Sequence, residues 1–102
     1  YSISKAADLA LARNIAVEWG HKNIRGNCIA PGLIRTDFAK ALWDNEKILE
    51  ATLRTCPMKR IGESDEIAGA AVFLASAAAG YMNGQAMVID GGRLAGAPRL
   101  QL

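Results

Sequence analysis

Two short apolar segments, each ended by glycine, most constrain what this chain can fold into. Residues 24–30 and residues 85–90 are rich in apolar side chains, and a Pro-Gly pair follows the first segment and a Gly-Gly pair the second. Short apolar runs bounded by such breakers are typical of buried strands. Helical patterns separate the two segments, and parallel strands need a crossover of that kind, so the sequence predicts two parallel strands of an α/β fold.

Three stretches have helical periodicity. Residues 1–19 place apolar side chains, many of them alanine, three and four positions apart, and residues 38–53 form a broken helical pattern. Residues 64–78 carry acidic side chains in the first turn and an apolar run behind them. The predicted order of helix, strand, split helix, helix and strand is that of the second half of a doubly wound parallel sheet, which two strands alone leave incomplete.

Local signals predict where several of these elements begin and end. Ser64 is expected to cap the helix that follows it, because its hydroxyl can accept a hydrogen bond from a free amide of the first turn. Gly20 is expected to end the first helix. Gly26 weakens the first strand, because glycine gives up entropy and side-chain packing there. The tail, residues 93–102, contains two further breakers and is expected to be irregular.

The chain opens on Tyr1 inside a helical pattern, with neither a methionine nor a capping residue before it. A helix normally has a capping residue ahead of its first turn. We therefore expect an upstream part that this sequence does not include, and we expect that part to supply the missing strands of the sheet.

Composition limits the classes of function. Hydrophobic residues make up 51% and charged residues 22% of the 102 residues, as in globular domains. The formal net charge is +2 and no basic cluster occurs, so no nucleic-acid partner is expected. No apolar run of about 18 residues occurs, so no membrane span is expected. Cys28 and Cys56 lie too far apart for a zinc or redox motif, so no metal site is expected, and their simplest interpretation is reduced thiols in the cytoplasm.

Tyr1 and Lys5 form a Y-x-x-x-K pattern, and residues four apart share one face of a helix. A tyrosine with a pKa of ~10 exchanges protons poorly at neutral pH, and a neighbouring ammonium lowers that pKa because it favours the phenolate. The pair is therefore suited to acid/base chemistry between a carbonyl and an alcohol. Taken alone the pattern is weak, and an exposed tyrosine beside a solvated lysine is the simpler interpretation.

The surrounding sequence changes that interpretation. Further blocks follow in order along the chain: YSISKAA at 1–7, IRGNCIAPGLIRT at 24–36, PMKRIGESDEIA at 57–68, and YMNGQ at 81–85 with DGG at 90–92. Together they resemble the short-chain dehydrogenase/reductases, in particular the bacterial type that includes 3-oxoacyl carrier protein reductases. The resemblance implies a Rossmann-type doubly wound parallel sheet, of which residues 1–92 would be the C-terminal catalytic part and residues 93–102 a tail.

The resemblance also implies roles for single residues. Tyr1 matches the catalytic acid/base of the family, and Lys5 matches the lysine that lowers the tyrosine pKa, holds the nicotinamide ribose and relays protons. Ile34 matches the residue whose backbone meets the nicotinamide carboxamide, and Thr36 matches a hydroxyl that contacts the carboxamide or the pyrophosphate. The cofactor-binding residues implied in this way are Tyr1, Lys5, Pro31, Gly32, Leu33, Ile34 and Thr36.

The residues of the second block agree with that assignment. Pro31 and Gly32 break the strand at its carboxyl end, where open α/β sheets bind ligands, and glycine permits close approach of the backbone to a flat cofactor. Residues 38–53 match a mobile substrate lid. Within it, Phe38 and Trp43 are candidates to line a substrate pocket, although Trp43 is equally compatible with a packing role.

The implied activity is hydride transfer between NAD or NADP and a small-molecule carbonyl or alcohol. The implied protein is a cytoplasmic homo-oligomer, a dimer or a tetramer. Relatives pair through the helix that corresponds to residues 1–19, where Ala7, Ala10 and Ala12 offer little bulk. In relatives the last helix and the last strand commonly build a second interface.

Three departures from the family pattern qualify this interpretation. Gly26 stands where relatives usually carry a branched apolar residue. The glycine-rich phosphate loop and the upstream catalytic serine and asparagine do not occur in this sequence, and neither does the residue that selects NAD or NADP. Two alternatives therefore stay open: a catalytically silent relative retained as a binding or scaffold subunit, and a fragment that is inactive without its upstream half.

Overall fold

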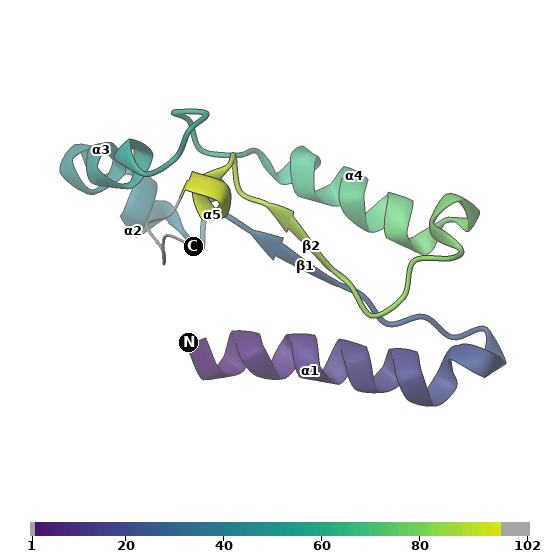
Figure 1. Cartoon of the computed structure of the whole chain (residues 1–102). Helices are drawn as coiled ribbons and strands as arrows, with labels where there is room; N and C mark the ends of the chain where they lie inside the picture. Colours follow the sequence, from purple (N-terminus) through teal and green to yellow (C-terminus); the bar gives the residue numbers. More distant parts are fainter. Residues whose placement is uncertain (1, 97–102) are drawn as a thin grey trace. The chain divides into compact units, whose positions relative to one another are not determined.

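The structure is a computed structural model that describes residues 2–96. Tyr1 and residues 97–102 lie outside the described residues. The elements follow in the order α1 (Ser2–Trp19), η1 (Gly20–Lys22), β1 (Cys28–Pro31), α2 (Lys40–Trp43), α3 (Glu46–Arg54), α4 (Ser64–Ala75), η2 (Ala77–Ala79), β2 (Ala86–Ile89) and α5 (Arg93–Gly96), where η marks a 3-10 helix (Figure 1).

The chain divides into two compact units. The first unit consists of Tyr1–Ala30 and Ala68–Val88, and the second consists of Pro31–Ile67 and Ile89–Leu102. The first unit therefore contains α1 and most of both strands, and the second contains α2, α3 and α5.

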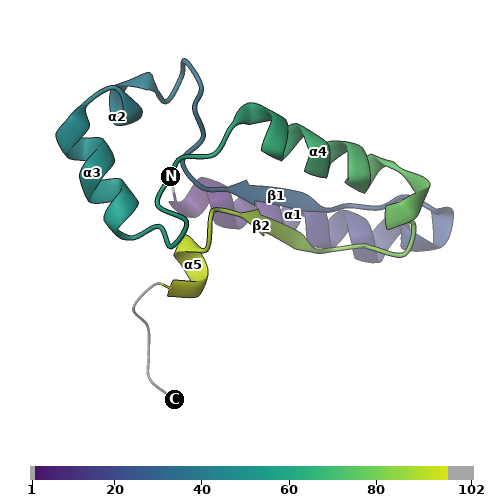
Figure 2. The same ribbon diagram turned by 90° about the horizontal axis from the view of Figure 1, so that it is seen from above.

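β1 and β2 pair side by side as parallel strands (Figures 1 and 2). In the first unit the amide of Cys28 donates to the carbonyl of Gln85 at 2.9 Å, and in the second the amide of Gly32 donates to the carbonyl of Ile89 at 2.9 Å. Both bonds join residues with the same separation along the chain, which is the pattern of parallel strands. The predicted α/β fold with two parallel strands is confirmed, and the structure adds that the two strands are neighbours. Both strands are shorter than predicted.

Gly26 lies before β1, and the prediction that it weakens the strand is wrong. Gly26 is buried, and a Cβ placed there would lie 2.6 Å from the carbonyl oxygen of Ala12 and 3.1 Å from Cβ of Ile15. Its amide donates to Oδ1 of Asn83 at 2.9 Å, and its carbonyl accepts from the amide of Gly84 at 2.7 Å. Gly26 is therefore the point at which α1 lies against the chain, and the absent side chain makes that approach possible.

Because of this contact, one face of α1 is buried within the chain and the other is exposed. Ala12 is 6% exposed and Ala16 is 8% exposed, because both lie on the face that meets Gly26 and Gly84. Ala7 and Ala10 are exposed. The prediction that Ala12 belongs to a subunit-pairing surface is therefore wrong, since Ala12 is covered by its own chain.

α1 ends at Trp19, directly before Gly20, as predicted, but the chain stays helical beyond that point. It continues as η1, and the left-handed residue that ends the helical stretch is Asn23, with φ of 61°. The amide of Asn23 donates to the carbonyl of Gly20 at 3.0 Å. Asparagine is one of the few residues besides glycine that adopts this conformation at low cost.

The start of α4 is held by an acidic residue, and the prediction that Ser64 caps the helix is wrong. Ser64 is the first residue of α4, and the carboxylate of Glu66 reaches back to accept from the amide of Glu63 at 2.9 Å. The same carboxylate receives two hydrogen bonds of 2.8 Å from the Arg60 guanidinium. The Arg60 hydrogen bonds, followed by that of the Glu63 amide, lower the pKa of Glu66 from 4.5 to about 2.

Residues 93–102 were predicted to be irregular, and for residues 93–96 this prediction is wrong, because Arg93–Gly96 form α5. The reason is the carboxylate of Asp90, whose two oxygens accept from the amides of Gly92 and Leu94, each at 2.9 Å. Gly92 adopts a φ of 95°, which glycine reaches without strain and which turns the chain into the helix.

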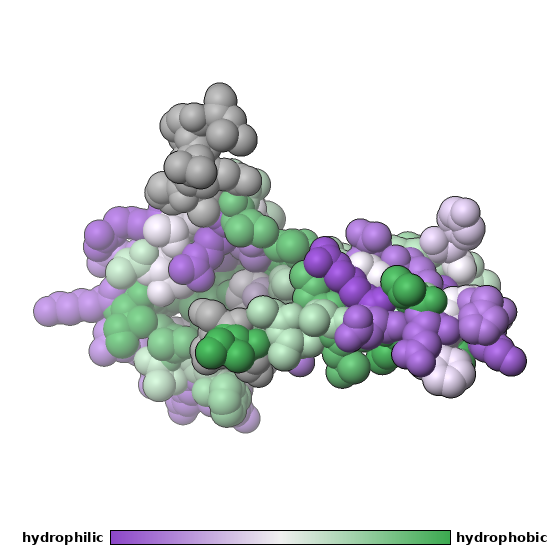
Figure 3. Space-filling view, turned by 60° about the horizontal axis from the view of Figure 1, so that its bottom comes forward, coloured by the Kyte–Doolittle hydropathy of each residue, from purple (hydrophilic) through white to green (hydrophobic). Residues whose placement is uncertain are grey.

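The described residues bury few large side chains. Their buried hydrophobic residues are Ala12, Ala16, Cys56, Ile61 and Ala79. Several large apolar side chains are instead exposed, and Figure 3 shows hydrophobic groups on the surface of the molecule. No described helix combines the length and the hydropathy that a bilayer span requires.

Candidate functional site

The candidate acid/base pair belongs to the first unit. Lys5 lies in α1 with an exposed side chain, seven residues before Ala12. Seven residues are close to two helical turns, so Lys5 shares the face of α1 that packs at Gly26. Tyr1 lies outside the described residues, so its predicted role stays a prediction.

The candidate nicotinamide-binding loop follows β1 in the second unit. Ile34 forms a parallel bridge with Gly62. The carbonyl of Leu33 accepts from the Gly62 amide at 2.9 Å, and the amide of Arg35 donates to the Gly62 carbonyl at 2.8 Å. In such a bridge the central residue turns its own N–H and C=O away from its partner. Among residues 2–96, neither main-chain group of Ile34 has a hydrogen-bond partner.

Two glycines fix the path of this loop. A Cβ at Gly62 would lie 2.7 Å from Cδ1 of Ile34, so the side chain of Ile34 occupies the space that Gly62 leaves. A Cβ at Gly32 would lie 2.9 Å from Cα of Asp90. Gly32 was predicted to permit close approach to a cofactor, and the backbone of Asp90 also approaches it from within the chain. Pro31 is the exposed last residue of β1.

Thr36 and Trp43 connect the loop to α2. Oγ1 of exposed Thr36 accepts from the amide of Ala39 at 3.2 Å, which leaves the hydroxyl proton able to donate elsewhere. Nε1 of half-buried Trp43 donates to the main-chain carbonyl of Thr36 at 2.9 Å. Trp43 therefore packs and donates within the chain, whereas Phe38, the other pocket candidate, is 101% exposed.

Arg35 completes this cluster. Its guanidinium carbon lies 5.2 Å from the centroid of the Trp43 ring, and its Nε lies 3.0 Å from Oε1 of Glu63. A guanidinium over an indole face is attracted by the ring quadrupole. Sequence reasoning missed the role of Arg35, because the three partners are separated along the chain and no local motif signals their contact.

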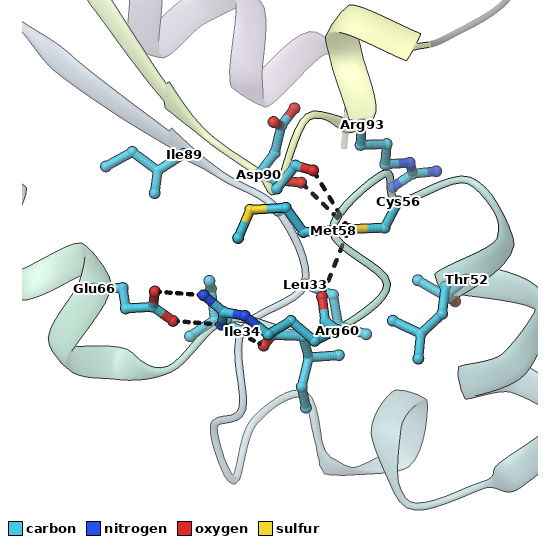
Figure 4. A pocket seen from close by; sticks show the side chains of 15 residues that line it. Leu33, Ile34, Thr52, Cys56, Met58, Arg60, Glu66, Ile89, Asp90 and Arg93 are labelled. Atoms are coloured by element: carbon cyan, nitrogen blue, oxygen red, sulfur yellow. Dashed lines mark hydrogen bonds and ion pairs between the residues drawn. The ribbon is translucent and has the colours of Figure 1, made fainter.

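A cavity of about 120 Å³ lies behind the loop in the second unit (Figure 4). Its apolar lining consists mainly of Leu33, Ile34, Leu53, Met58, Ile61 and Ile89. The thiol of Cys56, 7% exposed, faces three carbonyl oxygens, those of Arg60 at 3.5 Å and of Asp90 and Gly91 at 3.8 Å. Figure 4 shows the Arg60 guanidinium turned toward the Glu66 carboxylate. The charged groups Arg60 and Glu66 in the lining are therefore paired with each other.

Within the described residues, no group of three or more histidine, cysteine, aspartate or glutamate side chains could hold a metal ion.

The amino-acid sequence is similar to those of known proteins. The sequence model of a family described as enoyl-(acyl carrier protein) reductase matches residues 1–93. Dehydrogenase/reductase SDR family member 4 of Bos taurus is 45% identical over 94 residues, which are 92% of this chain and 34% of that protein. The 3-oxoacyl-acyl-carrier-protein reductase of Chlamydia trachomatis is 46% identical over 92 residues, which are 90% of this chain and 36% of that protein. The chain thus spans about a third of the length of these curated relatives.

The chain is also similar to solved structures of dehydrogenases. A proposed 2-deoxy-d-gluconate 3-dehydrogenase of Agrobacterium tumefaciens with bound NADP superposes with a TM-score of 0.90 at 44% identity, over 93% of this chain and 39% of that chain. A 4-hydroxyisoleucine dehydrogenase complexed with NADH superposes with a TM-score of 0.91 at 33% identity, over 95% of this chain and 40% of that chain.

Proposed function

Because this chain belongs to the short-chain dehydrogenase/reductase family and corresponds to its C-terminal portion, we propose that the protein transfers hydride between NAD or NADP and a small-molecule carbonyl or alcohol. Solved relatives bind NADP or NADH, which supports either nicotinamide cofactor. Tyr1 and Lys5 would serve as the acid/base pair, and the loop that contains Ile34 and Thr36 would hold the nicotinamide.

The observation that carries this proposal is the pairing of Ile34 with Gly62. It leaves one main-chain N–H and one C=O of Ile34 without a partner among residues 2–96, just beyond the carboxyl end of β1. Open α/β sheets bind ligands at that end. A carboxamide offers one acceptor and two donors, so it complements both groups of Ile34. The residues of this loop therefore fit a nicotinamide.

The cofactor, when bound, supplies or accepts the hydride. The residues of this chain would transfer the proton. In the direction of reduction, Oη of Tyr1 would give its proton to the carbonyl oxygen as that oxygen gains charge, and in the direction of oxidation the phenolate would take the alcohol proton. Lys5, one helical turn further along, would favour the phenolate and hold the ribose hydroxyls.

Replacement of Tyr1 by phenylalanine tests the proposal in a polypeptide that joins this chain to an upstream part and so has the full length seen in its relatives. Tyr1→Phe should lower kcat for carbonyl reduction by about 10²–10⁴-fold, the usual contribution of an acid/base group, and should leave cofactor affinity nearly unchanged. Tyr81→Phe, at the fully exposed other tyrosine, is the matched control and should not change the rate. A Tyr1→Phe protein within tenfold of the wild-type kcat would refute the assignment.

A further inference from the structure

Trp43 forms a direct connection between the start of the lid segment and the candidate nicotinamide-binding loop. The lid segment, residues 38–53, contains α2 and nearly all of α3. The indole N–H is a donor only, and its acceptor at 2.9 Å is the main-chain carbonyl of Thr36. A hydrogen bond to that carbonyl restricts the orientation of the peptide group that ends the loop.

Arg35 holds the same indole from the loop side. The guanidinium lies 5.2 Å from the Trp43 ring centroid and is paired with Glu63 at 3.0 Å, so its position is fixed from two directions. The main chain of Arg35 is bonded to Gly62 at 2.8 Å. The unpartnered main-chain groups of Ile34 are those of the residue immediately before Arg35, so a shift of Arg35 also moves them.

α2 is a short helix with few side-chain ties to the loop. It has four residues, a length that is not stable as an isolated helix, and no side chain caps its start at Ala39. It packs against α3, and main-chain bonds join its start to the loop, from the Ala39 amide to the Thr36 carbonyl at 3.1 Å and from the Lys40 amide to the Asp37 carbonyl at 3.2 Å. The side-chain ties are the Trp43 indole and the Thr36 hydroxyl, which accepts from the Ala39 amide.

From these contacts we propose that Trp43 is a positioning residue, which sets the conformation of residues 34–36 through Thr36 and Arg35 and so couples the lid segment to cofactor binding. The proposal rests on the proposed function, because it assigns the cofactor to this loop. Trp43 acts through its neighbours and not on the reacting atoms. Its loss should therefore weaken cofactor binding more than it slows the chemical step.

The test uses the polypeptide that contains the upstream half, with NADH and NADPH as the titrated probes. Trp43→Phe keeps an aromatic ring beside Arg35 and removes the indole N–H. It should raise the Kd of the bound cofactor by about 3- to 10-fold, the usual effect of one lost hydrogen bond, with kcat at saturating cofactor within about twofold. Trp19→Phe, at the 45% exposed end of α1, is the matched control and should leave the Kd unchanged.

Two further measurements keep the proposal testable where Trp43→Phe does not fold. Arg35→Met should raise the cofactor Kd in the same direction, since it removes the cation above the indole. In the Trp19→Phe protein, tryptophan emission should shift when cofactor is added. A Trp43→Phe protein that binds cofactor as tightly as wild type but unfolds at lower temperature would show a packing role and overturn this proposal alone. A wild-type protein that binds neither NADH nor NADPH would overturn it together with the proposed function.

Discussion

Gly26 packs against Ala12, a residue that is remote in sequence, and this contact leaves no room for a side chain. A Cβ there would lie 2.6 Å from the carbonyl oxygen of Ala12, a backbone atom that cannot rotate aside. The backbone of Gly26 is also bonded at both of its polar groups, to Asn83 and Gly84. In this chain, α1 and the segment before β1 therefore meet so closely that a side chain at position 26 would displace α1.

Replacing this glycine should destabilise the protein. Gly26→Ala should lower the free energy of unfolding by about 1–3 kcal/mol, the usual cost of overpacking, because α1 must shift to admit the methyl group. Gly69→Ala in α4 is the matched control, since a Cβ at Gly69 meets nothing within 4 Å. That change should raise the stability by about 0.5–1 kcal/mol because alanine favours the helix. Denaturant unfolding of both variants at one protein concentration checks the pair, and equal effects would contradict the packing argument.

The sequence predicted where strands end, but it did not predict which atomic contacts require a glycine at those positions. Pro31 and Gly32 were predicted to end a strand, and β1 does end at Pro31. That Gly32 faces the backbone of Asp90 could not be read from the sequence, because the contact exists only once β1 and β2 are paired. The same holds for Trp43, whose acceptor is a carbonyl and therefore leaves no mark on the sequence of the partner.

At the scale of elements, the end of α1 at Trp19 and the start of α4 at Ser64 were predicted, whereas the groups that hold these ends were not. Residues 38–53 were predicted as a broken helix, and the structure splits them into α2 and α3 with Asn45 as the cap of the second. Ser64 was favoured as a cap by residue type alone. The structure instead uses Glu66, because its carboxylate can serve the Glu63 amide and the Arg60 guanidinium together.

The start of α4 should be sensitive to acid. The pKa of Glu66 is lowered to about 2 from 4.5, so the folded state favours the carboxylate. A depressed folded pKa gives a stabilisation that is fully present above 4.5 and is lost as the pH falls toward 2. Glu66→Gln should lower the melting temperature at neutral pH and reduce its fall between pH ~6 and ~3. Glu50→Gln, at an exposed carboxylate of α3, is the control, and an identical pH profile for both variants would contradict the role of Glu66.

At the scale of the whole molecule, α1 presents an apolar stripe on the face opposite its internal contact. Ile3 and Val17 are each 87% exposed, and exposed Ala7 and Ala10 lie between them at helical spacing. Two bulky apolar groups flanking small ones suit the close approach of a second helix. The resemblance to the family implies pairing through this helix, and we propose that two copies of the protein meet at this stripe.

A charge placed on the stripe should separate the subunits. Ala10→Glu should shift the protein that contains the upstream half from dimer or tetramer to a smaller species, because an unpaired carboxylate in an apolar interface is costly. Lys47→Gln on exposed α3 makes the same change in net charge and should leave the assembly intact. Light scattering of both variants at one concentration is the measurement. An unchanged mass for Ala10→Glu would place the interface elsewhere.

The sequence order predicted two parallel strands but not their pairing with each other. It also predicted that two strands cannot complete a sheet, and the burial pattern supports that prediction. Three of the five buried hydrophobic residues are alanines, so little apolar area is removed from water within the described residues. The chain also spans about a third of the length of its curated relatives. We therefore expect residues 1–102, produced alone, to bind neither NADH nor NADPH.

The physical reason is that cofactor binding needs ordered groups on both halves of such a sheet. The Ile34 main chain offers two hydrogen bonds to a carboxamide, whereas a pyrophosphate is usually held at a helix N-terminus with a glycine-rich turn, which this sequence lacks. A chain that leaves large apolar groups such as Phe38 and Tyr81 exposed should also aggregate or stay loosely folded. Fluorescence titration of the 102-residue chain with both cofactors, beside the polypeptide that contains the upstream half, measures the difference. Saturable micromolar binding by the 102 residues alone would show that they carry a complete cofactor site.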